Sequence, residues 1–197
     1  MKSPKEKKKS RGPTLYDPTS DKPFQLSRYR IELFMRCPRC FWLALRVGLK
    51  RPPMYPYTLN NAVDLLMKKE MDVYRKKQKP HPFMKRCGIN AVPFKHPKLS
   101  NWRLTTKGKG MRYLFPGTNL DIMGSPDDVW LILSDNPPSI AIVDTKATSA
   151  KKIHPIEDDW WKSYKRQIDI YIWLLDRQGT GYPGSRTGYF LLLNGDA

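Results

Sequence analysis

The segment Ile140-Ala141-Ile142-Val143-Asp144-Thr145-Lys146 decides the fold class of this chain. Its four consecutive apolar residues are typical of a strand that is buried on both faces of a sheet. Because side chains alternate along a strand, Asp144 and Lys146 at its end are expected to point to the same face. The segment therefore predicts a carboxylate and an ammonium group in one site, at the end of a buried strand.

Short strands and longer helices are predicted on either side of this segment. Residues typical of strands, separated by Pro, Gly, Asn and Asp turns, occupy Met111–Phe115, Leu120–Met123, Val129–Leu133 and Gly188–Leu193. Apolar residues three to four positions apart predict helices from Ser27, with a break at Pro38, and over Asn61–Lys77 and Asp158–Arg177. The fold class is therefore α/β, a mixed sheet of about four or five strands with helices on both sides and a helical N-terminal extension.

Two segments show weaker patterns. Residues 79–110 are rich in Pro, Lys and Gly and are expected to form a long loop or basic insertion rather than a core element. In the last helix the apolar ridge is interrupted only by Gln167. Its members are Trp160, Tyr164, Ile168, Tyr171 and Leu175.

The charge of the chain indicates a polyanionic partner. Its 197 residues contain 36 Lys and Arg and 18 Asp and Glu, a net charge of +18. Residues 1–12 hold six basic residues and one acidic residue, which leaves 30 basic and 17 acidic residues, a net charge of +13, on the rest. We expect residues 1–24 to be a flexible basic arm and residues 25–197 to form one domain. Nucleic acid is the leading candidate partner, ahead of an anionic membrane surface, and the alternative is a basic surface that serves solubility alone.

The remaining composition suggests a cytoplasmic protein. No stretch approaches the roughly 20 apolar residues that span a bilayer, and the basic N-terminus lacks the apolar core of a secretory signal. The cysteines are odd in number: Cys37, Cys40 and Cys87. The spacing Cys37-Pro38-Arg39-Cys40 suits a metal or cluster better than a disulfide framework, although two cysteines without a second pair are more often a feature of helix packing. Histidines that could complete a zinc site are His81, His96 and His154.

A second carboxylate is expected near Asp144. Asp127 follows the turn Gly124-Ser125-Pro126 and precedes the strand Val129–Leu133. If that strand neighbours Ile140–Asp144, the carboxylates of Asp127 and Asp144 approach each other. Two carboxylates a few ångströms apart repel, and a divalent cation relieves the repulsion.

The active site of the PD-(D/E)XK nucleases resembles the set formed by Asp127, Asp144, Lys146, Gln167 and Tyr171. The Gln-x-x-x-Tyr spacing is similar to that of the RecB-like branch of this superfamily. This branch is related to CRISPR-associated and recombination exonuclease-type nuclease domains. The resemblance implies a restriction-endonuclease-like core. It also implies that Asp127, Asp144 and the carbonyl of Thr145 bind Mg²⁺ or Mn²⁺ and that Lys146 acts on the attacking water or the scissile phosphate. Gln167 and Tyr171 would support the site from the following helix and contact the nucleic acid. The alternative is an ordinary core strand with a salt bridge beside an amphipathic helix.

The same resemblance leaves two candidates for a ligand on the helix Asn61–Lys77. Family members commonly carry His or Glu there, and this chain has Asp64 and Glu70. The context Asn60-Asn61-Ala62-Val63-Asp64 is similar to the family pattern and favours Asp64. A helical wheel favours Glu70, which is expected in the middle of the apolar face. A buried salt bridge would explain either residue equally well.

The segment from Leu26 to Leu43, with Cys37 and Cys40, also resembles RecB-like nucleases that carry an iron–sulfur cluster. Such members use one early and three late cysteines, and this chain has none after Cys87. Either the cluster has been lost, or the chain stops before the late cysteines, which its ending just past a strand would fit.

The sequence therefore predicts a metal-dependent nuclease that hydrolyses DNA phosphodiester bonds through a Mg²⁺-activated water. Two other functions remain open: a non-catalytic nucleic-acid-binding module, and a structural subunit with protein partners in a DNA repair or CRISPR-type complex.

Overall fold

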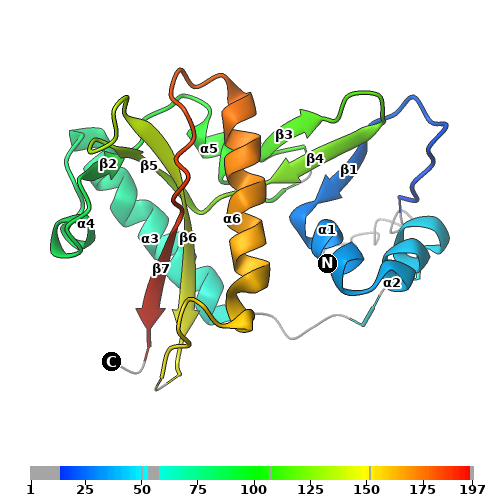
Figure 1. Ribbon diagram of the computed structural model, residues 1–197, viewed down its shortest axis with the longest axis horizontal. Helices are drawn as coiled ribbons and strands as arrows, with labels where there is room; N and C mark the ends of the chain where they lie inside the picture. The colour runs from blue at the N-terminus through cyan, green and yellow to red at the C-terminus, as the bar shows by residue number, and fades with distance from the viewer. Residues whose placement is uncertain (1–13, 50, 53–57, 107, 151, 196–197) are drawn as a thin grey trace, which may run out of the picture.

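The computed structural model describes residues 14–49, 51–52, 58–106, 108–150 and 152–195, which form an α/β structure with two mixed sheets (Figure 1). The larger sheet has the strand order β2-β5-β6-β7, and its strands are β2 (Ala91–Pro93), β5 (Asp128–Ile132), β6 (Ser139–Thr148) and β7 (Tyr189–Asn194). The smaller has the order β1-β4-β3, and its strands are β1 (Phe24–Ser27), β4 (Leu120–Gly124) and β3 (Met111–Leu114). The α/β class and the predicted strands are confirmed, but the expectation of a single mixed sheet is wrong. The sheets separate where Ser125-Pro126 joins β4 to β5, since proline cannot donate a ladder hydrogen bond.

Helices pack on both sheets. They are α1 (Arg28–Arg36), α2 (Pro38–Trp42), a π-helix (Leu43–Val47), α3 (Thr58–Lys77), α4 (Pro82–Arg86), α5 (Leu99–Trp102) and α6 (Lys162–Leu175), with 3-10 turns at Asp159–Trp161 and Asp176–Gln178. The helices predicted from the sequence are confirmed in α1 to α2, α3 and α6, and the chain breaks at Pro38 as expected. None of the described helices combines the length and the apolar character that crossing a bilayer requires.

Strand β6 lies between the two long helices. It pairs antiparallel with β5 and parallel with β7. Ile140 and Ile142 belong to the apolar cluster that includes α6, whereas Ala141 and Val143 belong to the cluster that includes α3. The side chains of β6 therefore alternate between two covered faces, which explains the uninterrupted apolar run. In Figure 1, α6 stands in front of the larger sheet and α3 behind it.

Residues 79–110 contain core elements, so their prediction as a loop or insertion is wrong. This part of the chain forms α4, β2 and α5, and β2 pairs antiparallel with β5. Its buried apolar residues are Met84, Ala91, Val92, Phe94, Leu99 and Trp102. Elements of three to five residues are too short to show a period, and the Pro and Lys residues between them dominate the composition.

The N-terminal region is joined to the fold earlier than expected. Residues 1–13 of the predicted arm lie outside the described residues. Tyr16 donates its backbone N–H to the carbonyl of Leu45 (2.8 Å), and Phe24 is buried at the start of β1. β1 pairs in parallel with β4. The described part of the predicted arm is therefore attached to the smaller sheet and to the N-terminal helices.

The start of α6 corrects one predicted core residue. Trp160, expected on the buried ridge, is 50% exposed, and Trp161 is 2% exposed in its place. These residues lie in a 3-10 turn, in which side chains repeat every three residues instead of every 3.6. The helical wheel that was extended backwards from α6 therefore assigned the wrong tryptophan to the core.

Candidate active site

Asp144 is the most deeply buried of the predicted site residues, with 1% of its surface exposed. Strand β6 carries it on the face that α6 covers, where Gln167 Nε2 donates to its Oδ1 (2.7 Å). Arg28 Nη2 in turn donates to Gln167 Oε1. The sequence analysis missed Arg28, because no local pattern signals that the start of α1 returns to α6, 139 positions away.

Lys146 follows two residues later on the same face, as predicted. Its Nζ pairs with Asp144 Oδ2 and lies 4.8 Å from the ring centroid of Tyr164 on α6. The ammonium group thus stands between a buried carboxylate and an aromatic face. Both surroundings stabilise its positive charge.

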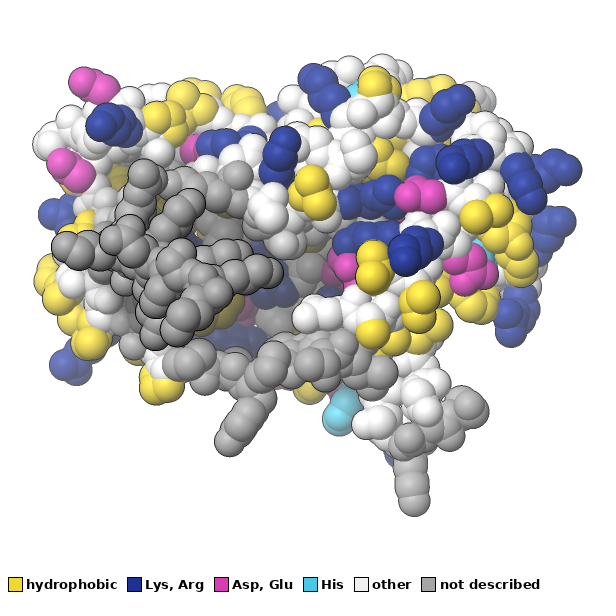
Figure 2. Space-filling view, turned by 180° about the vertical axis from the view of Figure 1, so that it is seen from behind, with side chains coloured by type: hydrophobic (Ala, Val, Ile, Leu, Met, Phe, Trp, Pro, Cys, Tyr) yellow, Lys and Arg dark blue, Asp and Glu magenta, His cyan; other side chains and the backbone are white. Residues whose placement is uncertain are grey.

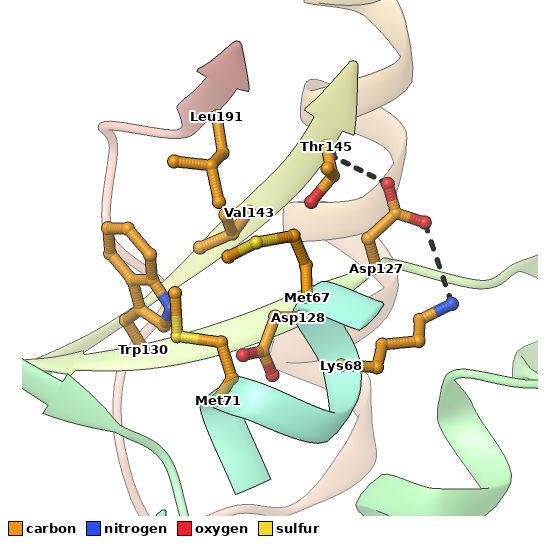
Figure 3. A pocket seen from close by; sticks show the side chains of 9 residues that line it. All are labelled: Met67, Lys68, Met71, Asp127, Asp128, Trp130, Val143, Thr145 and Leu191. Carbon is orange, nitrogen blue, oxygen red and sulfur yellow. Dashed lines mark hydrogen bonds and ion pairs between the residues drawn. The ribbon is translucent and has the colours of Figure 1, made fainter. Parts of the chain in front are cut away.

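Asp127 approaches the end of β6 from the loop before β5. Its Oδ2 accepts a hydrogen bond from the backbone N–H of Thr145 (2.7 Å), and its Oδ1 lies 3.8 Å from Lys68 Nζ on α3 (Figure 3). Burial, together with the negative charges of Asp144 and Asp64, raises the pKa of Asp127 to about 7, against the opposing effects of the Thr145 N–H and Lys68. The three carboxylates therefore lie close enough to repel one another.

The neighbouring Asp128 has a different role. It points away from Asp127 (Figure 3), and its Oδ1 accepts a hydrogen bond from Arg75 Nη2 of α3 (2.5 Å). Asp128 pairs with Arg75, seven residues along α3 from the Lys68 that Asp127 approaches, and of the two carboxylates only Asp127 lines the cleft. The ion pair of Asp128 connects β5 to α3.

The structure places Asp64, and not Glu70, beside the other carboxylates. Asp64 Oδ2 accepts a hydrogen bond from Lys68 Nζ (2.7 Å), and its Oδ1 is buried with no hydrogen-bond donor. The side chain of Glu70 is 51% exposed and pairs with His81 Nε2 (2.9 Å). The helical-wheel prediction that Glu70 points into the apolar face is therefore wrong. Six residues turn an α-helix by roughly 600°, which leaves the two carboxylates about 120° apart around α3.

Gln167 and Tyr171 support the site from α6, where they are only 6% and 7% exposed. Burial raises the pKa of Tyr171 to about 12, and the positive charge of Arg28 partly offsets this effect. The Tyr171 ring packs on Gly124 so closely that a Cβ added to the glycine would overlap the ring. The glycine of the Gly124-Ser125-Pro126 turn thus permits the close approach of α6 to β4. Both side chains have little surface left with which to contact nucleic acid.

The predicted residues line one open cleft of about 620 Å³. All seven contribute to it: Asp64, Asp127, Asp144, Thr145, Lys146, Gln167 and Tyr171. Basic residues of other elements also line it, namely Arg28, Lys68 and Arg103. A separate cavity of about 10 Å³ lies between α3 and the sheet (Figure 3), with space for a single water molecule at most, and is too small for a substrate.

The donor set of this cleft suits a hard divalent cation, since carboxylate and carbonyl oxygens are the ligands that Mg²⁺ prefers. Asp64 Oδ1 and Asp144 Oδ2 are buried without a hydrogen-bond donor, although Asp144 Oδ2 has the ammonium of Lys146 beside it. Across the described parts of the chain, however, no three His, Cys, Asp or Glu side chains converge closely enough to hold a metal ion together. To bind a cation, Asp64 and Asp144 would therefore have to turn away from Lys68 and Lys146.

No cysteine or histidine of the described residues lines this cleft. The Cys37 sulfur accepts the backbone N–H of Cys40 (3.2 Å) and caps α2, and Cys87 is exposed at the end of α4. His96 stacks on Trp102 with ring centroids 4.5 Å apart. Cys37 thus has a local structural role at the break between α1 and α2.

Comparisons with protein-family models, curated proteins and solved structures found no match for this chain. Its function must therefore be argued from the geometry and charge of the cleft.

Proposed function

We propose that this chain is a magnesium-dependent deoxyribonuclease that hydrolyses DNA phosphodiester bonds. The observation that supports this most is that Asp64, Asp127, Asp144 and Lys146 line one open cleft although they come from three separate segments of the chain. In the same proposal, the larger sheet with α3 and α6 corresponds to the restriction-endonuclease-like core of the RecB-like PD-(D/E)XK nucleases. The smaller sheet with α1 and α2 is then the N-terminal extension.

Each residue of the cleft has its own role in this proposal. Asp64, Asp127, Asp144 and the Thr145 carbonyl would hold Mg²⁺ or Mn²⁺, which supplies Lewis-acid polarisation of the phosphate and a bound water of lowered pKa. Lys146 brings a positive charge to the scissile phosphate, where negative charge increases during hydrolysis. Gln167 fixes the orientation of Asp144 through its 2.7 Å hydrogen bond. Arg28, Lys68 and Arg103 attract the phosphate backbone to the cleft.

A non-catalytic nucleic-acid-binding module is the second candidate. The ammonium groups of Lys146 and Lys68 already neutralise Asp144 and Asp64, as they would in a purely structural ion-pair network. In that case the basic surface would serve binding or docking in a repair or CRISPR-type complex, and the protein would not cut DNA.

The test uses the full chain and end-labelled single- and double-stranded DNA, with Mg²⁺, Mn²⁺ or EDTA. We expect cleavage only with metal, and its loss in Asp127→Ala, Asp144→Ala and Lys146→Ala, while DNA affinity stays within about tenfold because phosphate contacts are dispersed. Asp64→Ala should also lose activity, whereas the matched control Glu70→Ala should cut normally. A readout without catalysis is the melting temperature, which Mg²⁺ should raise for the wild type and less for Asp64→Ala. Wild-type cleavage by Asp144→Ala would exclude the proposed mechanism.

A further inference from the structure

A second cavity, of about 730 Å³, opens beside the candidate active site at the end of β6. It shares Asn60 and Lys146 with the catalytic cleft, so the two spaces adjoin. Its walls are the end of β6, residues 152–154 and the start of α6, which lie side by side in Figure 1. A strand that leaves the catalytic cleft past Lys146 would enter this cavity.

One wall of the cavity is aromatic. Trp160 is half exposed, and the ring of His154 stacks on it with centroids 5.5 Å apart and an interplanar angle of 16°. The ring centroids of Tyr164 and Trp160 are 5.0 Å apart, and the ammonium of Lys146 lies over the Tyr164 ring. The buried Trp161 holds the His154 segment in place, because its Nε1 donates to the His154 carbonyl (3.0 Å). The wall is therefore a positioned aromatic platform, and Trp160 keeps part of its surface open.

The charges around this platform are favourable for an anionic ligand. Lys146 and Lys152 line the cavity, and no carboxylate does so among the described residues. The acidic side chains next to its lining residues are paired: Asp144 with Lys146, Asp158 with His154 (3.2 Å) and Asp159 with Lys162 (2.7 Å). A half-exposed tryptophan beside two lysines suits a nucleotide, because the base can stack on an aromatic ring and the lysines can neutralise its phosphate.

We propose that this cavity is a stacking subsite for one unpaired base of single-stranded DNA, placed next to the scissile phosphate. A base in a duplex stacks on its neighbours and cannot offer its face to Trp160, so the subsite selects a substrate with a single-stranded segment. The inference rests on the proposed nuclease function for the position of the phosphate. Binding at the platform, however, can be measured without cleavage.

The test is the affinity of the full chain for a fluorescent oligonucleotide in EDTA, measured by anisotropy. Three DNAs of equal length are compared: a single strand, the same strand with abasic sites, and a duplex. The wild type should bind the single strand most tightly, because the abasic strand keeps the phosphates but lacks bases to stack. Trp160→Ala should weaken single-strand binding about tenfold and remove the preference over the abasic strand. Trp160→Phe keeps an aromatic face and should retain most of the preference.

The matched control is Trp42→Ala, since Trp42 is 57% exposed on α2 and does not line the cavity. It should bind all three DNAs as the wild type does. The inference is overturned if the wild type shows no preference for unpaired bases, or if Trp160→Ala keeps it. Because EDTA excludes metal-dependent cleavage, this binding test is independent of the cleavage test. If the wild type does not cleave DNA with metal but prefers unpaired bases, and Trp160→Ala removes that preference, the nuclease proposal is refuted and the proposal of a stacking subsite stands.

Discussion

At the scale of single residues, the charge of Asp144 is removed almost completely from solvent and needs partners. Gln167 and Lys146 contact its two oxygens, and Arg28 holds Gln167 from behind. A buried carboxylate without such partners is costly, so this series of interactions offsets the cost of burying Asp144 at the end of β6. Arg28 touches neither oxygen of Asp144 in this arrangement, and we infer that it is a positioning residue.

We predict that Arg28→Ala lowers the rate of cleavage about 10- to 100-fold and raises the Mg²⁺ concentration for half-maximal activity. Without Arg28 the Gln167 amide is free to turn its carbonyl oxygen toward Asp144, which would repel the carboxylate. The Mg²⁺ dependence of cleavage should be restored in part by Arg28→Lys, which keeps a donor. Arg186→Ala, at an exposed position, is the control. An unchanged Mg²⁺ dependence in Arg28→Ala would show that Arg28 does not position the site.

At the scale of secondary structure elements, an ion-pair cluster attaches α1 to α6. Glu32 is 6% exposed and accepts hydrogen bonds from Arg36 of its own helix (2.9 Å) and from Arg166 of α6 (2.8 Å). The hydrogen bond from Arg166 lowers the pKa of Glu32 from its usual value of 4.5, against burial and with the help of Arg36. Since Arg28 also lies on α1, this cluster helps to hold Arg28 at the cleft.

The cluster should make stability depend on pH in acid. The pKa of Glu32 is lower in the folded than in the unfolded chain. Its ion pairs therefore stabilise the fold fully at pH values above the pKa of the unfolded chain. This contribution disappears as the pH falls through the pKa of the folded chain. Glu32→Gln should cost about 1 kcal/mol near neutral pH, since solvent screens both arginines. Its melting temperature should then approach that of the wild type as the pH falls below the usual carboxyl pKa of 4.5.

Melting curves of the wild type, Glu32→Gln and the exposed-site control Glu157→Gln at several pH values measure this difference. The control should follow the wild type throughout. A difference in melting temperature between Glu32→Gln and the wild type that stays constant as the pH falls below 4.5 would show that the charge of Glu32 does not contribute.

At the scale of the whole molecule, basic side chains are spread over the surface. Figure 2 shows Lys and Arg side chains across the face opposite to Figure 1, with acidic side chains among them. The chain therefore remains basic even when the six basic residues of positions 1–12 are left out of the count. Such a distribution favours many weak phosphate interactions over one strong one, and these interactions release counterions when DNA binds.

Removal of residues 1–12 should weaken DNA binding and flatten its dependence on salt. The slope of log affinity against log salt should fall by about 0.7 to 0.9 for each phosphate that the arm no longer neutralises. A full-length chain in which the six basic residues of this segment are Gln separates charge from length and should behave like the truncated chain. If the slope of both variants equals that of the wild type, the arm does not bind DNA.

The local sequence by itself determined the α/β class, the long helices, the strands around Asp144 and the shared face of Asp144 and Lys146. These features depend on side-chain directions that repeat every 3.6 residues in a helix and every two in a strand, so nearby residues are enough to predict them. Tertiary structure alone decided what depends on distant segments. It separated the strands into two sheets, made core elements of residues 79–110 and brought Arg28 to Gln167. It also brought Asp64 rather than Glu70 to the cleft, because the direction of a helical side chain depends on the surface that the helix packs against, and for α3 that surface includes β6.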